Sequence, residues 1–123
     1  MKKLMLDTNF LVLPFQFQVD PFEEFDRILN KKNNLYTIDK CISEAKTIEN
    51  NSYSSLVTKL IEKKPIEVID TSSSKNADDL LLEFSERGYV VCTNDRELRE
   101  RIKKKGSPVV ILRGENKLQY QVP

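Results

Sequence analysis

The stretch KLMLDTNFLV, residues 3–12, places an acid directly after a run of apolar residues. Residues 4–6 form an apolar run that does not alternate with polar residues, which is typical of a strand covered on both faces. Asp7 follows this run at once. Since a buried carboxylate without a partner is costly, we expect Asp7 to have a function at the end of the strand.

Strand and helix patterns alternate along the rest of the chain. Strands are expected at residues 3–8, 35–38, 66–70, 89–93 and 108–113. Helices are expected at residues 21–31, 39–48, around 56–61, 77–88 and 94–105, with Asp39 and Asn94 as N-caps. Pro14 and Pro21 are expected to prevent a long regular element in the first connection. Residues 114–123 either add an edge strand or stay irregular.

This alternation predicts one α/β domain spanning residues 1–123. Right-handed crossovers would place helices on both faces of a central, mostly parallel sheet of four or five strands, in a three-layer α/β/α arrangement. In such sheets, ligands bind beyond the carboxyl ends of the strands. Asp7 ends the first strand and Asp95 follows the fourth, so both are expected at the same edge.

Composition excludes several kinds of chemistry. The chain of 123 residues contains no histidine, which removes Ser-His-Asp and Cys-His catalysis and histidine-bearing zinc sites. The net charge of +1 gives no global basic field. Cys41 and Cys92 lie too far apart for a zinc knuckle, and Cys92 is expected to be a buried thiol. No apolar run is long enough to span a bilayer, so the cytoplasm is the expected location.

Acids gather where strands end and helices begin. Glu44 lies early in the helix after the second strand, and Asp78 and Asp79 begin the helix before the fourth. Taken singly, each acid has an ordinary explanation, because helix N-termini attract negative side chains. Taken together with Asp7 and Asp95, they would repel one another unless a cation joined them. Oxygen ligands suit Mg²⁺ or Mn²⁺, and such ions assist the hydrolysis of phosphodiesters without histidine.

Four segments then resemble the acidic motifs of PIN-domain ribonucleases, in the same order along the chain. They are LMLDTNFLV (4–12), ISEA (42–45), KNADDLLLEF (75–84) and VVCTNDREL (90–98). The likeness is closest to the archaeal and eukaryotic branch that processes ribosomal RNA, and VapC-type toxins share the fold. The resemblance implies a metal-dependent endoribonuclease that uses one or two Mg²⁺ or Mn²⁺ ions.

Site residues follow from the resemblance by position. It implies that the catalytic acids are Asp7, Glu44, Asp78 and Asp95, and that the metal ligands come from Asp7, Asp78, Asp79 and Asp95. Neighbouring helical residues diverge by about 100°, so Asp78 and Asp79 cannot both face one ion; Asp78 is favoured slightly. Residues matching positions that hydrogen-bond the acids are Thr8, Asn9, Thr93 and Asn94, although turns and caps alone also favour these types.

Basic residues near the acids are candidates for contact with RNA. Arg96, Arg99 and Lys103 share one helical face beginning beside Asp95, and Lys75 precedes the third acid. The alternative is an ordinary solvated helix surface. Phenylalanines crowd the first connection, and exposure of several of them would indicate a dimer or partner surface.

Three other functions stay open. The first is the toxin half of a toxin–antitoxin pair, with an antitoxin partner. The second is a non-catalytic RNA-binding module for ribosome assembly, and the third is cleavage of structured DNA. A homodimer is implied by the resemblance to VapC-type proteins alone.

Overall fold

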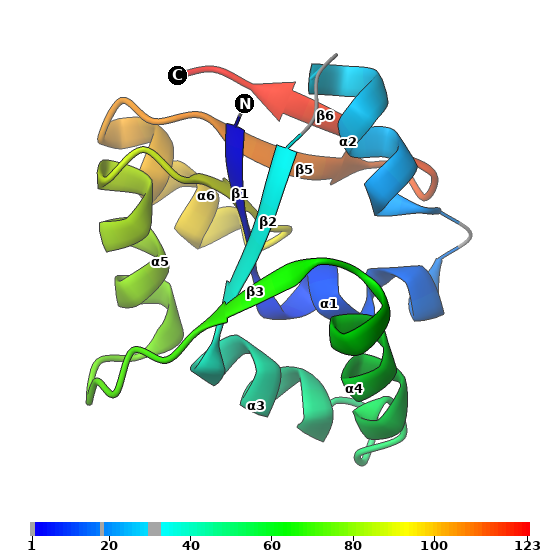
Figure 1. The fold of residues 1–123 in the computed structure, drawn as a ribbon. Coiled ribbons are helices and arrows are strands. Elements are labelled where there is room, and N and C mark those ends of the chain that lie inside the picture. Colours follow the sequence, from blue (N-terminus) through cyan, green and yellow to red (C-terminus); the bar gives the residue numbers. More distant parts are fainter. Residues whose placement is uncertain (1, 18, 30–32) are drawn as a thin grey trace.

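The computed structural model describes residues 2–17, 19–29 and 33–123 and shows a sheet with helices on both faces (Figure 1). The elements, in chain order, are β1 (Lys2–Leu6), α1 (Thr8–Gln16), α2 (Pro21–Leu29), β2 (Asn33–Ile38), α3 (Asp39–Thr47), α4 (Ser54–Lys63), β3 (Ile66–Ile69), α5 (Ala77–Glu86), β4 (Val90–Cys92), α6 (Arg96–Lys104), β5 (Val109–Arg113) and β6 (Lys117–Gln121). The predicted α/β class is confirmed. The tail adds a sixth strand, β6, to the four or five that were expected.

The order of strands across the sheet is β3-β2-β1-β4-β5-β6, and only β6 runs antiparallel to its neighbour. The chain moves outward from β1 to β2 and β3, then returns to β4 on the other side of β1. This reversal puts α1 to α4 on one face of the sheet and α5 and α6 on the other (Figure 1). The switch point therefore lies between β1 and β4, the place where sheets of this kind bind ligands.

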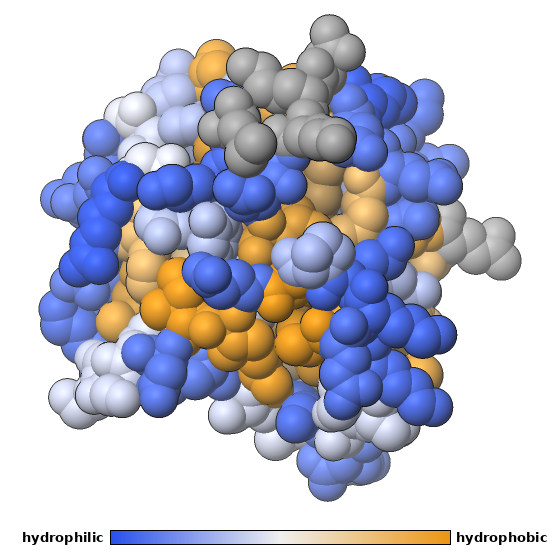
Figure 2. Space-filling model, viewed as in Figure 1, coloured by the Kyte–Doolittle hydropathy of each residue, from blue (hydrophilic) through white to orange (hydrophobic). Residues whose placement is uncertain are grey.

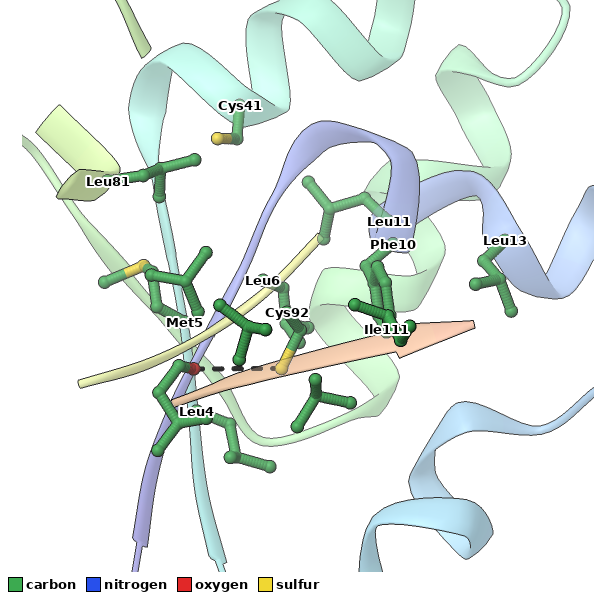
Figure 3. Packing of buried hydrophobic residues seen from close by; sticks show 14 of the residues in the cluster. Leu4, Met5, Leu6, Phe10, Leu11, Leu13, Cys41, Leu81, Cys92 and Ile111 are labelled. Atoms are coloured by element: carbon green, nitrogen blue, oxygen red, sulfur yellow. Dashed lines mark hydrogen bonds between the residues drawn. The ribbon is translucent and has the colours of Figure 1, made fainter. Parts of the chain in front are cut away.

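The core surrounds β1, as its unbroken apolar run predicts. Leu4 and Met5 are completely buried, and Leu6 is paired in register with Cys92 of β4. Figure 3 shows Leu6 and Cys92 in one group of packed side chains with Phe10, Leu11 and Ile111. The prediction that Cys92 is a buried thiol is confirmed.

The sequence predicts no helix between the first strand and residue 21, and this is wrong, because α1 occupies Thr8–Gln16 with Pro14 inside it. No long element forms, as expected, because α1 ends at Gln16 and α2 begins at Pro21. Proline in a helix loses one hydrogen bond and crowds the carbonyl four residues earlier. Here the helix ends two residues later, at Gln16, so the disturbance is confined to its last turn. Burial of Phe10, Leu11 and Leu13 on the same helix outweighs it.

Both predicted N-caps are also wrong, because each side chain has a more distant partner. Asp39 is the first residue of α3, and its Oδ1 accepts hydrogen bonds from the Thr71 amide and hydroxyl at 3.0 and 2.8 Å. Asn94 Oδ1 accepts a hydrogen bond from the Leu112 amide at 2.9 Å. The cap of α6 is Asp95 instead.

The outer edge of β6 is closed by two side chains of α2. Glu24 Oε1 accepts a hydrogen bond from the Leu118 amide at 2.9 Å, and Arg27 Nη2 donates to the Leu118 carbonyl at 3.1 Å. Glu24 and Arg27 also pair with each other at 2.7 Å. The pair thus stands where a further strand would bind, which protects an exposed edge.

Replacing Glu24 by Gln is expected to make the fold less sensitive to acid. The hydrogen bond from Arg27 lowers the pKa of Glu24 from 4.5 to about 2. A pKa lowered by folding stabilises the protein above 4.5, and this stabilisation is lost as the pH falls toward 2. We expect Glu24→Gln to cost about 1 kcal/mol at neutral pH, a modest figure because the pair is partly exposed. Urea unfolding of the wild type and of Glu24→Gln at neutral pH and near pH 3 gives the cost of the substitution and the stability that each protein loses in acid. If both proteins lose the same stability on going to pH 3, the lowered pKa is not that of Glu24.

The opposite edge strand, β3, is open to solvent. Figure 2 shows hydrophobic atoms on the face that β3 crosses, framed by hydrophilic residues, and Val68 is 42% exposed. The strand is only four residues long, follows Pro65 and carries the exposed Glu67. A short strand with proline and charge is a protected edge.

The phenylalanines of the first connection mostly serve the core. Phe10 and Phe25 are buried and stack on each other, with ring centroids 6.5 Å apart. Phe15 stacks on Tyr53, and Phe22 packs edge-on against Phe25. None of these rings belongs to the largely exposed hydrophobic side chains of the described residues. Within the same residues, no helix combines the length and apolar character needed to cross a membrane.

Candidate active site

Asp7 lies at the switch point and is the single residue between β1 and α1. Its amide donates to the Cys92 carbonyl at 3.0 Å, which continues the pairing of β1 with β4. Its side chain caps α1 by accepting a hydrogen bond from the Thr8 amide at 2.7 Å. The residue is 4% exposed, so its carboxylate is held at the carboxyl edge of the sheet with little solvent.

Three further side chains orient the Asp7 carboxylate. Thr93, directly after β4, donates from Oγ1 to Asp7 Oδ2 at 2.5 Å, and Asn9 Nδ2 donates to the same oxygen at 3.4 Å. The Cys41 thiol, in the first turn of α3, donates to Asp7 Oδ1 at 3.7 Å. The carboxylate is thus fixed by groups from α1, α3 and the β4–α6 connection.

Thr93 also joins Asp7 to Asp95. Its hydroxyl oxygen accepts a hydrogen bond from the Asp95 amide at 3.0 Å while its hydrogen goes to Asp7. Asp95 then caps α6, where its Oδ1 accepts from the Leu98 amide at 3.1 Å. One threonine side chain therefore connects the Asp7 carboxylate to the backbone of Asp95, so the two residues lie at the same edge, as the sequence predicts.

Asparagines make a second connection across the same edge. Asn9 Oδ1 accepts a hydrogen bond from the Asn94 amide at 3.1 Å, so Asn9 contacts both Asp7 and the β4–α6 connection. Asn94 reaches away from the acids to the Leu112 amide. Asn9 and Thr93 thus touch an acid through their side chains, whereas Asn94 supports the loop.

Glu44 is brought to this edge by Thr8. The Thr8 hydroxyl, in the first turn of α1, donates to Glu44 Oε2 at 2.9 Å. Because α3 follows β2, which neighbours β1, the second turn of α3 lies beside the start of α1. Glu44 itself is exposed.

Asp78 and Asp79 diverge at the start of α5. Asn76 caps this helix by accepting from the Asp79 amide at 2.9 Å, which sets the rotation of the first turn. Asp79 forms an ion pair with Arg101 of α6 at 2.9 Å. Asp78 is half-buried, and the negative charges of Asp95, Asp7 and Glu44 act on its carboxyl group.

Electrostatics show that four acids share one region. Burial raises the pKa of Asp7, hydrogen bonds from Thr93 and Thr8 oppose this, and the negative charges of Glu44 and Asp95 raise it further. Burial and the negative charges of Asp95, Asp7 and Glu44 likewise raise the pKa of Asp78, against the positive charge of Arg101. Each acid makes the ionised form of its neighbours less favourable.

The donor set is the kind that Mg²⁺ and Mn²⁺ take, because it consists of carboxylate and amide oxygens. None of the three ion pairs among the described residues involves Asp7, Glu44, Asp78 or Asp95, so no basic side chain neutralises them directly. Within those residues, however, no group of three acidic or cysteine side chains is arranged to hold an ion. The chemistry of the donors fits a divalent cation.

The basic residues predicted to bind RNA have different surroundings. Lys75 pairs with Glu83 at 2.6 Å, and its carbonyl accepts a hydrogen bond from Lys40. Lys103 Nζ donates to Gln121 of β6 at 3.4 Å, toward the opposite end of the sheet from the acids. Arg96, the first residue of α6, is exposed next to Asp95, and Arg99 is half-buried one turn later.

Sequence patterns do not indicate the role of two residues near the acids, Cys41 and Arg101. The sequence shows only that Cys41 is far from Cys92 along the chain, and no pattern indicates the contact of Cys41 with Asp7. Arg101 lies on the same helix as the predicted arginines, but on another face. Its spacing from Arg96 and Lys104 was visible in the sequence; its pairing with α5 was not.

Comparisons with known proteins agree with this geometry. Residues 4–115 match the family model described as "PIN like domain". The chain is 25% identical over 121 aligned residues to ribonuclease VapC4 of Methanocaldococcus jannaschii, covering 92% of each chain. The PIN domain endonuclease Utp24 superposes with a TM-score of 0.79 at 24% identity, covering 98% of this chain and 92% of that one, which supports the fold. The family predicted from the four acidic segments is confirmed: this chain belongs to the PIN-like domain family.

Proposed function

We propose that this chain is an endoribonuclease that hydrolyses phosphodiester bonds of RNA at the edge formed by Asp7, Glu44, Asp78 and Asp95. The observation that carries the proposal is the buried Asp7, joined through Thr93 to Asp95 at the switch point. The relatives support it, since one is named a ribonuclease and the other an endonuclease.

The four acids would hold one or two Mg²⁺ or Mn²⁺ ions, which when bound neutralise charge on the phosphate and assist the attack of water. Asp7 is the central ligand in this proposal, because Thr8, Thr93, Asn9 and Cys41 fix its carboxylate. Thr8 positions Glu44 in the same way. One of the four carboxylates would accept a proton from the attacking water.

RNA would approach over the acids from the start of α6. Arg96 and Arg99 are the predicted contacts closest to Asp95 along this helix, and Lys75 lies in the connection leading to Asp78. Phosphate contacts of this kind position a strand without reading its sequence. Lys103 reaches Gln121 toward the opposite end of the sheet, so it lies farther from this path.

The direct test is cleavage of a labelled RNA pool by the purified protein with Mn²⁺, with Mg²⁺ and with EDTA, and of matched DNA. We expect cleavage of RNA with either ion, none with EDTA, and slower cleavage of DNA. Salt-dependent binding of RNA without cleavage under any condition would favour the non-catalytic module. Preferential cutting of DNA would replace RNA as the substrate.

A second candidate concerns the role of the same chemistry. The match to a protein named VapC4 favours a toxin ribonuclease with an antitoxin partner, against the processing of ribosomal RNA that the sequence resemblance implies. For both roles we propose a cytoplasmic location. Growth arrest on expression, abolished by Asp7→Asn, would support the toxin; normal growth with cleaved ribosomal RNA precursors would support processing.

A further inference from the structure

A groove of about 630 Å³ follows the exposed side of α6. It is lined by Arg96, Glu97, Glu100, Arg101 and Lys104. The groove begins at Arg96, immediately after the proposed catalytic Asp95, and extends over the nine residues of α6 to Lys104, a rise of eight residue steps. At 1.5 Å per residue this is about 12 Å, which is room for more than one backbone phosphate.

Arg101 is the cation of this groove that influences the acids. Its guanidinium pairs with Asp79 at 2.9 Å, and its positive charge partly opposes the rise that burial and the other acids cause in the pKa of Asp78. The two side chains of the pair are 40% and 46% exposed. An ion pair this exposed is weak, because water and salt screen it, so Arg101 can exchange partners at little cost.

We propose that Arg101 leaves Asp79 to bind a phosphate of the RNA strand beside the acids, with Arg96 and Lys104 contacting adjacent phosphates along the groove. This inference rests on the proposed function and extends it to residues outside the acidic motifs. A guanidinium binds phosphate through two parallel hydrogen bonds, which a single lysine ammonium cannot reproduce. Asp79 then acts as a competitor that holds Arg101 when RNA is absent.

The carboxylates of the groove define how RNA would be held. Glu97 and Glu100 offset part of the positive charge, so the attraction of RNA depends on direct contact more than on a long-range field.

The start of α5 gives the adjacent acids Asp78 and Asp79 different roles. Asn76 accepts a hydrogen bond from the Asp79 amide, the Asp79 side chain pairs with Arg101, and Asp78 stays under the influence of Asp95.

The test is a double-mutant cycle on binding, made in EDTA so that neither metal binding nor cleavage contributes. The probe is a fluorescein-labelled oligouridylate, followed by anisotropy. Arg101→Gln is expected to weaken binding about fivefold and to reduce the slope of log affinity against log salt by about 0.7. Asp79→Asn is expected to tighten binding about threefold, and to have no effect when Arg101→Gln is already present.

Arg87→Gln is the matched control. It removes the same charge at the far end of α5, where Arg87 lies over the ring of Phe84, and its effect is expected within about twofold. Arg101→Lys should fall between wild type and Arg101→Gln. Thermal unfolding verifies that every variant is folded.

Two results would overturn the inference. One is equal weakening by Arg101→Gln and Arg87→Gln; the other is an effect of Asp79→Asn that persists without Arg101. If the wild type cleaves RNA while either result is obtained, only this inference fails. If the wild type neither binds nor cleaves RNA, the proposed function fails with it.

Discussion

Asp7→Asn is expected to lower the rate of RNA cleavage at least about 10³-fold, since a bound divalent ion supplies several kcal/mol of transition-state stabilisation and each 1.4 kcal/mol is tenfold. Asn keeps the size of Asp and an oxygen able to cap α1 through the Thr8 amide. It removes the charge that burial and the negative charges of Glu44 and Asp95 disfavour. The Asn amide nitrogen would meet the Thr93 and Asn9 donors where Asp7 offers an oxygen, and this offsets the gain from removing the charge. We therefore expect the folded protein to be about as stable as the wild type.

The combination of lost activity with retained stability makes this test specific. Single-turnover cleavage in Mn²⁺ gives the rate, and thermal unfolding in metal-free buffer gives the stability. Asp26→Asn is a suitable control, because Asp26 is an exposed residue of α2 away from the site. If Asp7→Asn cleaves RNA at nearly the rate of the wild type, Asp7 has no catalytic role and the proposed site is wrong.

Asp78→Asn and Asp79→Asn are expected to differ strongly although the residues are adjacent. Asp78 shares the region of the other acids, so its loss should lower the cleavage rate about 100-fold or more. Asp79 pairs with Arg101 on the surface, and its substitution should change the maximal rate by less than about threefold.

Measuring rate against RNA concentration separates the two effects. Asp78→Asn should lower the maximal rate. Asp79→Asn should leave the maximal rate almost unchanged and lower the RNA concentration that gives half-maximal rate. Equal loss of rate in both variants would mean that the start of α5 rearranges to use both acids. A larger loss in Asp79→Asn would reverse the assignment.

The sequence predicts the edge of the sheet well, because parallel strands impose it. The unbroken apolar run before Asp7 and the strand before Asp95 leave few alternatives, and neighbouring parallel strands place their carboxyl ends together. The contact through Thr93 follows once β1 and β4 are adjacent.

What the sequence does not predict depends on partners distant along the chain. Choosing between Asp78 and Asp79 needs the rotation of α5, which its cap and its contact with α6 determine. Asp39 and Asn94 have ideal chemistry for capping, but Thr71 and Leu112 compete for them across the fold. Pro14 shows the same limit, since local propensity does not measure the burial gained by its helix.

The strand order has a consequence for how activity arises. Asp7 and Glu44 belong to the first half of the chain, and Asp78 and Asp95 to the second, so neither half alone carries the proposed centre. They meet only when β4 pairs with β1 on the side opposite β2 and β3. A nascent chain that has not yet paired β4 with β1 would therefore lack the proposed centre and could not cleave RNA there.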